Sequence, residues 1–144
     1  MVNKKNNISE IELLLRQVCF QIRKKGRVIL DEFNITPPQF DALQHLVNCG
    51  EHTISELSTK LYLAPSTITD LVDRMEKNDL VERVRSNEDR RTVKVRVLPK
   101  GLKLIEEVIN LRREYIAKSL IKLSEEDKDH FIKYLSVFSE SSEN

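Results

Sequence analysis

The spacing of the hydrophobic residues changes once along this chain, and that change limits the folds open to it. As far as Met75, apolar residues recur every three or four positions, the spacing of helices with one buried face. Segment 93–97 (VKVRV) then alternates strictly, and segment 81–85 (VERVR) alternates more loosely. Polar residues 86–92 separate the two runs. The pattern therefore predicts a single β-hairpin in an otherwise helical chain.

Capping signals indicate where the helices begin. A residue that can cap a helix stands three positions before Glu, Gln or Asp ahead of four amphipathic segments, at Asn7, Thr36, Thr53 and Ser124. Proline opens two further segments, at Pro65 and Pro99, where its missing N–H costs nothing. We expect a mainly α fold with a small β-hairpin wing and a polar tail from residue 139.

Two of the expected helices, 54–61 and 65–77, are joined by only Tyr62-Leu63-Ala64, which is the spacing of a helix-turn-helix. Burial of the apolar face of the second helix leaves hydroxyl side chains exposed at its first turn. Short hydroxyls allow close approach to base edges, while free backbone N–H groups can meet phosphate. Asp70 and Asp73 would need a basic partner, or Asp70 would accept from a cytosine amine. The candidate DNA-binding residues here are Pro65, Ser66, Thr67, Thr69, Asp70, Arg74 and Lys77.

Charge is segregated along the chain, although the whole chain carries only +1. Residues 83–103 hold eight basic side chains against two acidic ones, so this stretch can present a positive face to phosphates. An arginine at the end of a stiff two-stranded arm can enter a narrow minor groove. We expect the Asp89 carboxylate to hold the Arg91 guanidinium by a charge-assisted bond. The candidate DNA-binding residues of the wing are Arg83, Arg85, Asp89, Arg90, Arg91 and Lys94.

Length and composition narrow the class of protein. A chain of 144 residues is long enough for one domain with a real core. No apolar run could span a bilayer, and the first residues lack the apolar stretch of a signal peptide. Two cysteines make no disulfide framework, which fits a reducing compartment, so we expect a cytoplasmic protein. No catalytic set, cofactor motif or Gly-rich phosphate loop is present, so an enzyme is not expected.

The ordered series of motifs resembles the MarR family of bacterial transcriptional regulators. Segments 80–83 (LVER), 87–92 (NEDRRT) and 98–101 (LPKG) look like the family's wing, and 54–57 (ISEL) and 66–76 (STITDLVDRME) match its helix-turn-helix. The resemblance implies a winged-helix dimer, usually a repressor, on a pseudo-palindromic operator in double-stranded DNA. Asp79 departs from the family by standing where it often has glycine, and Leu98 where it often has a hydroxyl helix cap.

The resemblance also implies a division of labour within one MarR-like domain, residues 1–144. Residues 34–101 would form the DNA-binding winged helix, and the helices at 8–33 and 102–139 would form the dimer. The apolar residues of these terminal helices exceed what one small winged helix can cover, which favours a homodimer independently. By family analogy, a small aromatic or amphipathic effector would bind between the dimerisation helices and the DNA-reading part.

Two clusters leave other interpretations open. Cys19 is a candidate redox residue, as in the branch of the family that reports organic hydroperoxides, and Arg23 lies one helical turn away. The alternative is a small buried apolar residue. His45, Cys49 and His52 could approach a divalent metal, but no fourth ligand is evident. A winged helix that binds an acidic protein partner instead of DNA is a further alternative.

Overall fold

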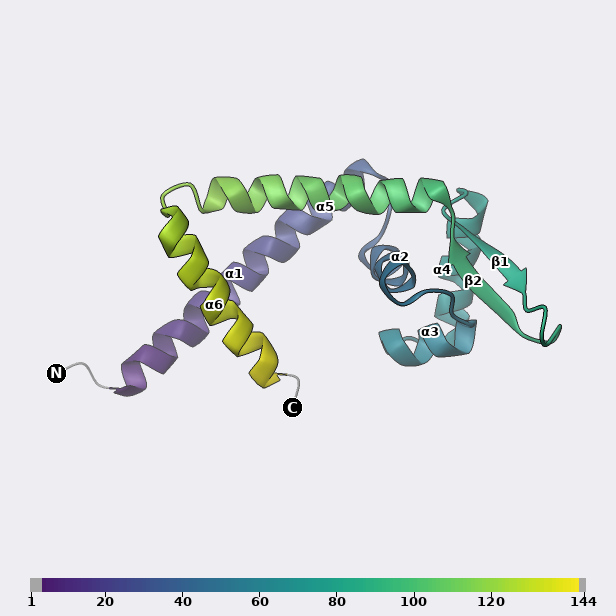
Figure 1. Ribbon diagram of the computed structural model, residues 1–144, viewed down its shortest axis with the longest axis horizontal. Coiled ribbons are helices and arrows are strands. Elements are labelled where there is room, and N and C mark those ends of the chain that lie inside the picture. The colour runs from purple at the N-terminus through teal and green to yellow at the C-terminus, as the bar shows by residue number, and fades with distance from the viewer. Residues whose placement is uncertain (1–3, 143–144) are drawn as a thin grey trace. The chain divides into compact units, whose positions relative to one another are not determined.

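The computed structural model describes residues 4–142, which form six helices and one hairpin (Figure 1). The chain divides into two compact units, with the boundary between Ile109 and Asn110 inside the fifth helix. The mainly α fold with one β-hairpin is confirmed. In chain order the elements are α1 (Lys4–Glu32), α2 (Pro37–Cys49), α3 (Ile54–Leu61), α4 (Pro65–Lys77), β1 (Val81–Arg85), β2 (Val93–Val97), α5 (Pro99–Ser119) and α6 (Glu125–Ser142).

The predicted caps set most of the helix starts. Thr36 and Gln39 form a reciprocal capping box at α2, and the Thr53 hydroxyl accepts from the Glu56 N–H at α3. Ser124 and Asp127 bond each other in the same reciprocal way ahead of α6. The expected start of α1 at the Asn7 motif is wrong, because α1 already begins at Lys4. A polar residue that can cap a helix does not stop one when its neighbours also favour the helix.

The end of the last helix also differs from the prediction. The helix continues through Ser142, past residue 139, where a polar tail was expected. The Ser141 hydroxyl donates to the Val137 carbonyl oxygen within the helix at 3.0 Å. A second serine of α6 makes a bond of the same kind at 2.8 Å. Local hydrogen bonding of this kind lets short polar side chains remain in a helix.

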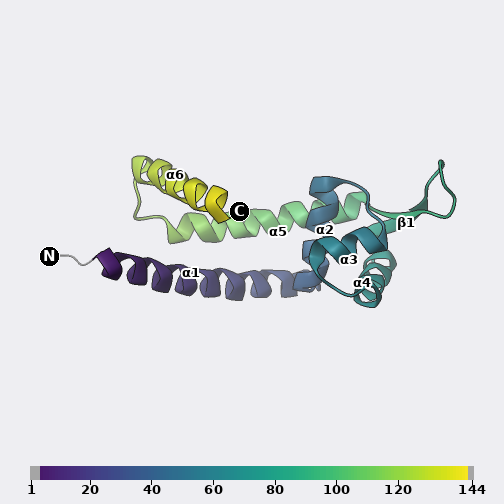
Figure 2. The same ribbon diagram turned by 90° about the horizontal axis from the view of Figure 1, so that it is seen from below.

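The hairpin has the predicted extent and pairing. Strands β1 and β2 are antiparallel, with Val81 opposite Val97 and Arg85 opposite Val93. The loop that joins them extends away from α3 and α4 (Figure 2). The backbone of His52, just before α3, adds a third, single-residue rung, because its N–H and C=O both bond Val95. The hairpin is thus fixed on one side to the chain between α2 and α3, and β1 packs against α4.

The core of the first unit lies where α2, α3, α4, the hairpin and the start of α5 meet. Its fully buried large side chains come from every one of these elements: Phe40, Leu43, Leu57, Ile68, Val72, Met75, Val81, Val95 and Val108. The four apolar residues expected on the inner face of α4 are all buried, namely Ile68, Leu71, Val72 and Met75. Burial of this set fixes the rotation of α4 about its axis and therefore decides which of its side chains face outward.

The terminal helices are not covered in this way. In the second unit, none of the described residues 110–141 is buried, and large apolar side chains of α6 such as Ile132, Tyr134 and Phe138 are exposed. The N-terminal half of α1 likewise exposes Ile8 and Val18. Within residues 4–142, no helix combines the length and apolar character that crossing a bilayer requires.

Two residues between α4 and α5 have backbone environments that restrict their identity. Asp79 has φ of 61°, a left-handed conformation, which explains why glycine is favoured here and why a short Asp is tolerated. Gly101 is buried at the start of α5, where an added Cβ would lie 2.4 Å from the carbonyl oxygen of Leu80 and 2.8 Å from Cγ1 of Val97. The same Leu80 oxygen accepts from the Leu98 N–H at 2.9 Å, so the backbone there is held in place.

We predict that Gly101→Ala destabilises the first unit. The new methyl group would push α5 off the hairpin, and overpacking of this kind costs roughly 1–3 kcal/mol. Urea unfolding followed by circular dichroism measures the change. Lys100→Ala, an exposed neighbour on the same turn, is the matched control and should leave stability almost unchanged. Equal stability of Gly101→Ala and the natural chain would contradict the close-approach argument.

Candidate nucleic-acid interface

The outward face of α4 carries the polar side chains expected of a reading helix. Most of the predicted residues are exposed, and only Thr69 is half-buried: Pro65, Ser66, Thr67, Asp70, Arg74 and Lys77 make up the exposed set. Asp70 has no ion-pair partner among the described residues. Of the two expectations for Asp70, acceptance from a cytosine amine is therefore the one that stays open. Contact of these side chains with DNA stays a prediction.

The N-terminus of α4 is open. Its N-cap is Ala64, whose side chain makes no capping hydrogen bond, and Pro65 at the first position has no N–H. The N–H groups of Ser66 and Thr67 have no acceptor within the helix, because the carbonyls four residues upstream lie before it. Free N–H groups at a helix N-terminus attract anions such as phosphate.

Arg83 has a different role from the one predicted. Its guanidinium bonds Asp73 at 2.6 Å and Glu76 at 2.8 Å, and its backbone N–H donates to the other Glu76 oxygen at 2.9 Å. Burial opposes the charge of Arg83, but the bonds to Asp73 and Glu76 outweigh it and raise the pKa of the guanidinium. Two carboxylates already match this charge, so Arg83 joins β1 to α4 and is not free to neutralise phosphate.

The sequence pattern does not predict this role of Glu76. It predicts only that Asp73 needs a basic partner, and the structure supplies that partner in Arg83. The available signal was the spacing of Asp73 and Glu76, which places both carboxylates on adjacent turns of one helix face. An arginine early in the strand that follows is within reach of such a pair.

Side chains at the end of the hairpin shape its loop. The Arg85 guanidinium donates to the Arg90 carbonyl oxygen at 2.8 Å. The Asp89 carboxylate accepts from the Arg91 backbone N–H at 3.0 Å and from the Thr92 hydroxyl at 3.3 Å. The predicted bond between the Asp89 carboxylate and the Arg91 guanidinium is therefore wrong. A carboxylate bonding the N–H two residues on is instead the usual way an Asp closes a tight turn.

Several cations of the wing and α4 have no acidic partner among residues 4–142. Arg96 pairs with Glu82 across the strands, so it adds no net charge. Among the described residues, no acidic side chain pairs with Arg90 or Arg91, which are exposed in the loop, or with half-buried Lys94 on β2. Arg74 and Lys77 at the end of α4 are likewise exposed and without an ion-pair partner in residues 4–142. The wing and the C-terminal end of α4 thus each carry cations that are not paired with a carboxylate in the described part of the chain.

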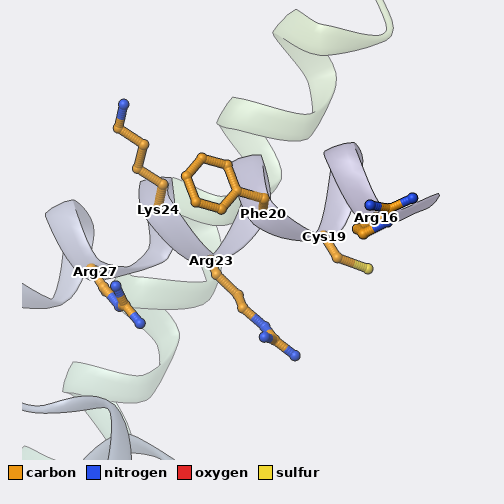
Figure 3. Close-up of a pocket in the computed structure, with 6 residues that line it drawn as sticks. All are labelled: Arg16, Cys19, Phe20, Arg23, Lys24 and Arg27. Atoms are coloured by element: carbon orange, nitrogen blue, oxygen red, sulfur yellow. The ribbon is translucent and has the colours of Figure 1, made fainter. Parts of the chain in front are cut away.

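Cys19 lies away from this surface, on α1. Its thiol is exposed, so no packing within the described chain buries it. It lines a hollow of about 640 Å³ with Arg16, Phe20, Arg23, Lys24 and Arg27, in which Cys19 and Arg23 point to the same side of the helix (Figure 3). Arg16 is already paired with Glu12 at 2.7 Å. The hollow therefore combines one aromatic ring, one thiol and three cations. These three cations form no ion pair with an acidic side chain in the described part of the chain.

The His45, Cys49 and His52 cluster does not form a metal site. Among the described residues, no group of three His, Cys, Asp or Glu side chains is placed to hold an ion. The His52 Nδ1 is 2.8 Å from the Gly50 carbonyl oxygen, and the rings of His45 and His52 meet edge to face. Burial, followed by the charges of His52 and Lys60, lowers the pKa of His45.

A two-helix motif with a three-residue turn, followed by a positively charged two-stranded wing, defines a winged helix-turn-helix DNA-binding protein. The MarR family model matches residues 35–93, which run from the end of the α1–α2 connection into β2. The chain belongs to the MarR family, and it is a DNA-binding transcriptional regulator.

Individual relatives agree with this assignment over nearly the whole chain. The HTH-type transcriptional regulator YsmB of Bacillus subtilis is 48% identical over 90% of this chain and 88% of its own length. A MarR family protein from Bacillus stearothermophilus has a solved structure that is 43% identical, with a TM-score of 0.89 over 99% of this chain and 100% of that chain. The transcriptional repressor MdtR of Bacillus subtilis is 28% identical over 83% of this chain and 77% of its own length.

Proposed function

We propose that the chain is a transcriptional repressor that binds a pseudo-palindromic operator as a homodimer. The observation that carries the proposal is the link that Arg83 makes between α4, whose N-terminus is open, and the hairpin, whose loop carries the unpaired Arg90 and Arg91. The helix would enter the major groove with Ser66, Thr67 and Thr69 toward base edges. The wing arginines would follow the neighbouring minor groove. Repression is supported by the name of a relative, the MdtR repressor.

The operator experiment separates the two parts of this surface. Arg91→Ala should weaken binding to operator and random duplex alike, and should reduce the slope of log affinity against log salt by about one per subunit. Thr67→Ala should instead reduce the discrimination between operator and random duplex by roughly tenfold, because base contacts carry sequence information. Both are measured by fluorescence anisotropy with a duplex selected by the natural chain from a random pool.

Arg113→Ala, which removes an exposed cation of α5 outside the interface, is the control and should change neither property. If Arg91→Ala bound every duplex as tightly as the natural chain at all salt concentrations, the wing would have no part in binding. If the natural chain bound an acidic protein and showed no preference among duplexes, the alternative of a protein-binding winged helix would be favoured.

A homodimer is supported by α6 and the N-terminal half of α1, where large apolar side chains are exposed. In α6, Phe131, Ile132 and Leu135 are all more than two-fifths exposed. Exposed apolar area of this extent is unusual in a monomer and indicates an interface. A second copy is the partner proposed here, because twofold symmetry also sets two reading helices about 34 Å apart, one turn of DNA.

We predict that deletion of residues 124–144 abolishes both dimerisation and tight operator binding. The core of the first unit contains no residue of this segment, so circular dichroism should still report its helices. Light scattering after gel filtration gives the mass. Leu135→Lys should shift the mass toward the monomer, whereas Ser136→Lys on the next position of α6 should do so less. A truncated monomer that bound the operator at full strength would refute the dimer.

Release by a small effector is the regulatory part of the proposal. The Phe20 ring lines the hollow on α1 together with Arg23, Lys24 and Arg27, and a ring combined with cations suits an aromatic carboxylate. The exposed Cys19 in the same hollow favours a second candidate, redox regulation. In that case an organic hydroperoxide would oxidise the thiol to a sulfenic acid and would itself be reduced to the alcohol.

A titration of the operator complex distinguishes these two signals. We expect benzoate or salicylate to release the natural chain, Arg23→Gln to require several-fold more acid, and Cys19→Ser to respond as the natural chain does. Lys60→Gln, an exposed cation of α3, serves as the charge-matched control. Release by cumene hydroperoxide that Cys19→Ser resists, with no response to the acids, would assign the redox mechanism instead.

A further inference from the structure

Tyr62 is a residue that the fold itself does not use. It lies in the turn between α3 and α4, and its side chain is 93% exposed. Its φ of 55° and ψ of 39° are left-handed, a conformation that costs an ordinary L-residue roughly 1–2 kcal/mol and that Gly or Asn adopts more readily. The structure gives the phenol no hydrogen-bond partner among the described residues. A large aromatic residue therefore occupies a strained position where it gains no packing in return.

The turn that carries Tyr62 is well fixed. The Ser58 carbonyl oxygen accepts from the N–H groups of both Tyr62 and Leu63, and the Ser58 hydroxyl donates to the Leu63 carbonyl oxygen. Leu57, next to Ser58, is completely buried. The Tyr62 ring is therefore presented on a rigid backbone, and its exposure does not come from a loose loop. A ring ordered before binding loses less entropy when a partner covers it.

The position of the turn indicates the partner. Tyr62 precedes α4 by three residues, and the turn leads directly into the open N-terminus with the free N–H groups of Ser66 and Thr67 (Figure 1). When the N-terminal residues of a reading helix enter the major groove, the turn before it lies over the sugar–phosphate backbone at the edge of the groove. Tyrosine hydroxyls are among the groups that donate to phosphate oxygens.

We propose that Tyr62 is a DNA-backbone contact that positions α4 in the groove. Its ring packs on a deoxyribose and its hydroxyl donates to a phosphate oxygen next to the N-terminus of the helix. This contact reads no base, so it strengthens operator and unrelated duplex alike. It also carries no charge, so it displaces no counterion. The proposal rests on the DNA interface described under Proposed function.

Two substitutions test the contact. Tyr62→Asn retains a residue that tolerates the left-handed conformation, so thermal unfolding should show stability equal to or above that of the natural chain. Its affinity for both the selected operator and a random duplex should fall about tenfold, while the salt slope stays unchanged, unlike that of Arg91→Ala. Tyr62→Phe retains the ring and loses only the hydroxyl, so its affinity should fall by a smaller factor.

The outcomes separate this proposal from the interface itself. Unchanged DNA affinity of Tyr62→Asn, alongside the expected effects of Arg91→Ala and Thr67→Ala, would overturn the role of Tyr62 and leave the interface intact. A lower melting temperature for Tyr62→Asn would also overturn it, since the ring would then serve the fold. If substitution of Tyr62, Thr67 and Arg91 all left binding to the selected operator unchanged, the proposed interface as a whole would be wrong.

Discussion

The bond network of Arg83 is the constraint on which the DNA-reading part of this protein depends. One guanidinium on β1 joins two carboxylates of α4, so the hairpin cannot turn away from the helix without breaking charged hydrogen bonds. The network also gives Asp73 and Glu76 a common basic partner. The same pairing holds the wing on α4, and it leaves Arg90 and Arg91 as the cations of the hairpin loop that are proposed to meet phosphate.

The basic residues of the wing therefore divide into two groups by their contacts. Arg83 and Arg96 are matched by carboxylates, and Arg85 holds the loop by bonding the Arg90 carbonyl oxygen. The guanidinium groups of Arg90 and Arg91 form no such bond within the described residues. A cluster of like charges in the sequence is thus partly framework and partly binding surface, and the distinction depends on which acidic or carbonyl groups the fold brings near.

The turns around α4 show how backbone conformation selects residues. Gly101 is required by the fold, because the Leu80 carbonyl oxygen occupies the space that a Cβ would need. Asp79 is tolerated in a left-handed position as a short polar residue. Tyr62 is neither required nor favoured by its backbone, and a side chain that does not serve the monomer points to an external partner. The exposed apolar faces of the terminal helices support a second copy by the same reasoning.

The sequence by itself determined the order and type of the elements, the extent of the hairpin and the buried face of α4. These follow from local information, since periodicity, caps and turn residues act within a few positions of each other. Only the tertiary structure decided the roles of individual residues. Arg83 meets Asp73 ten residues away, Asp89 turns to its own loop, His52 pairs with Val95, and Cys19 stays exposed. Those outcomes depend on which groups packing places side by side, and a pattern of residue types along the chain does not contain that information.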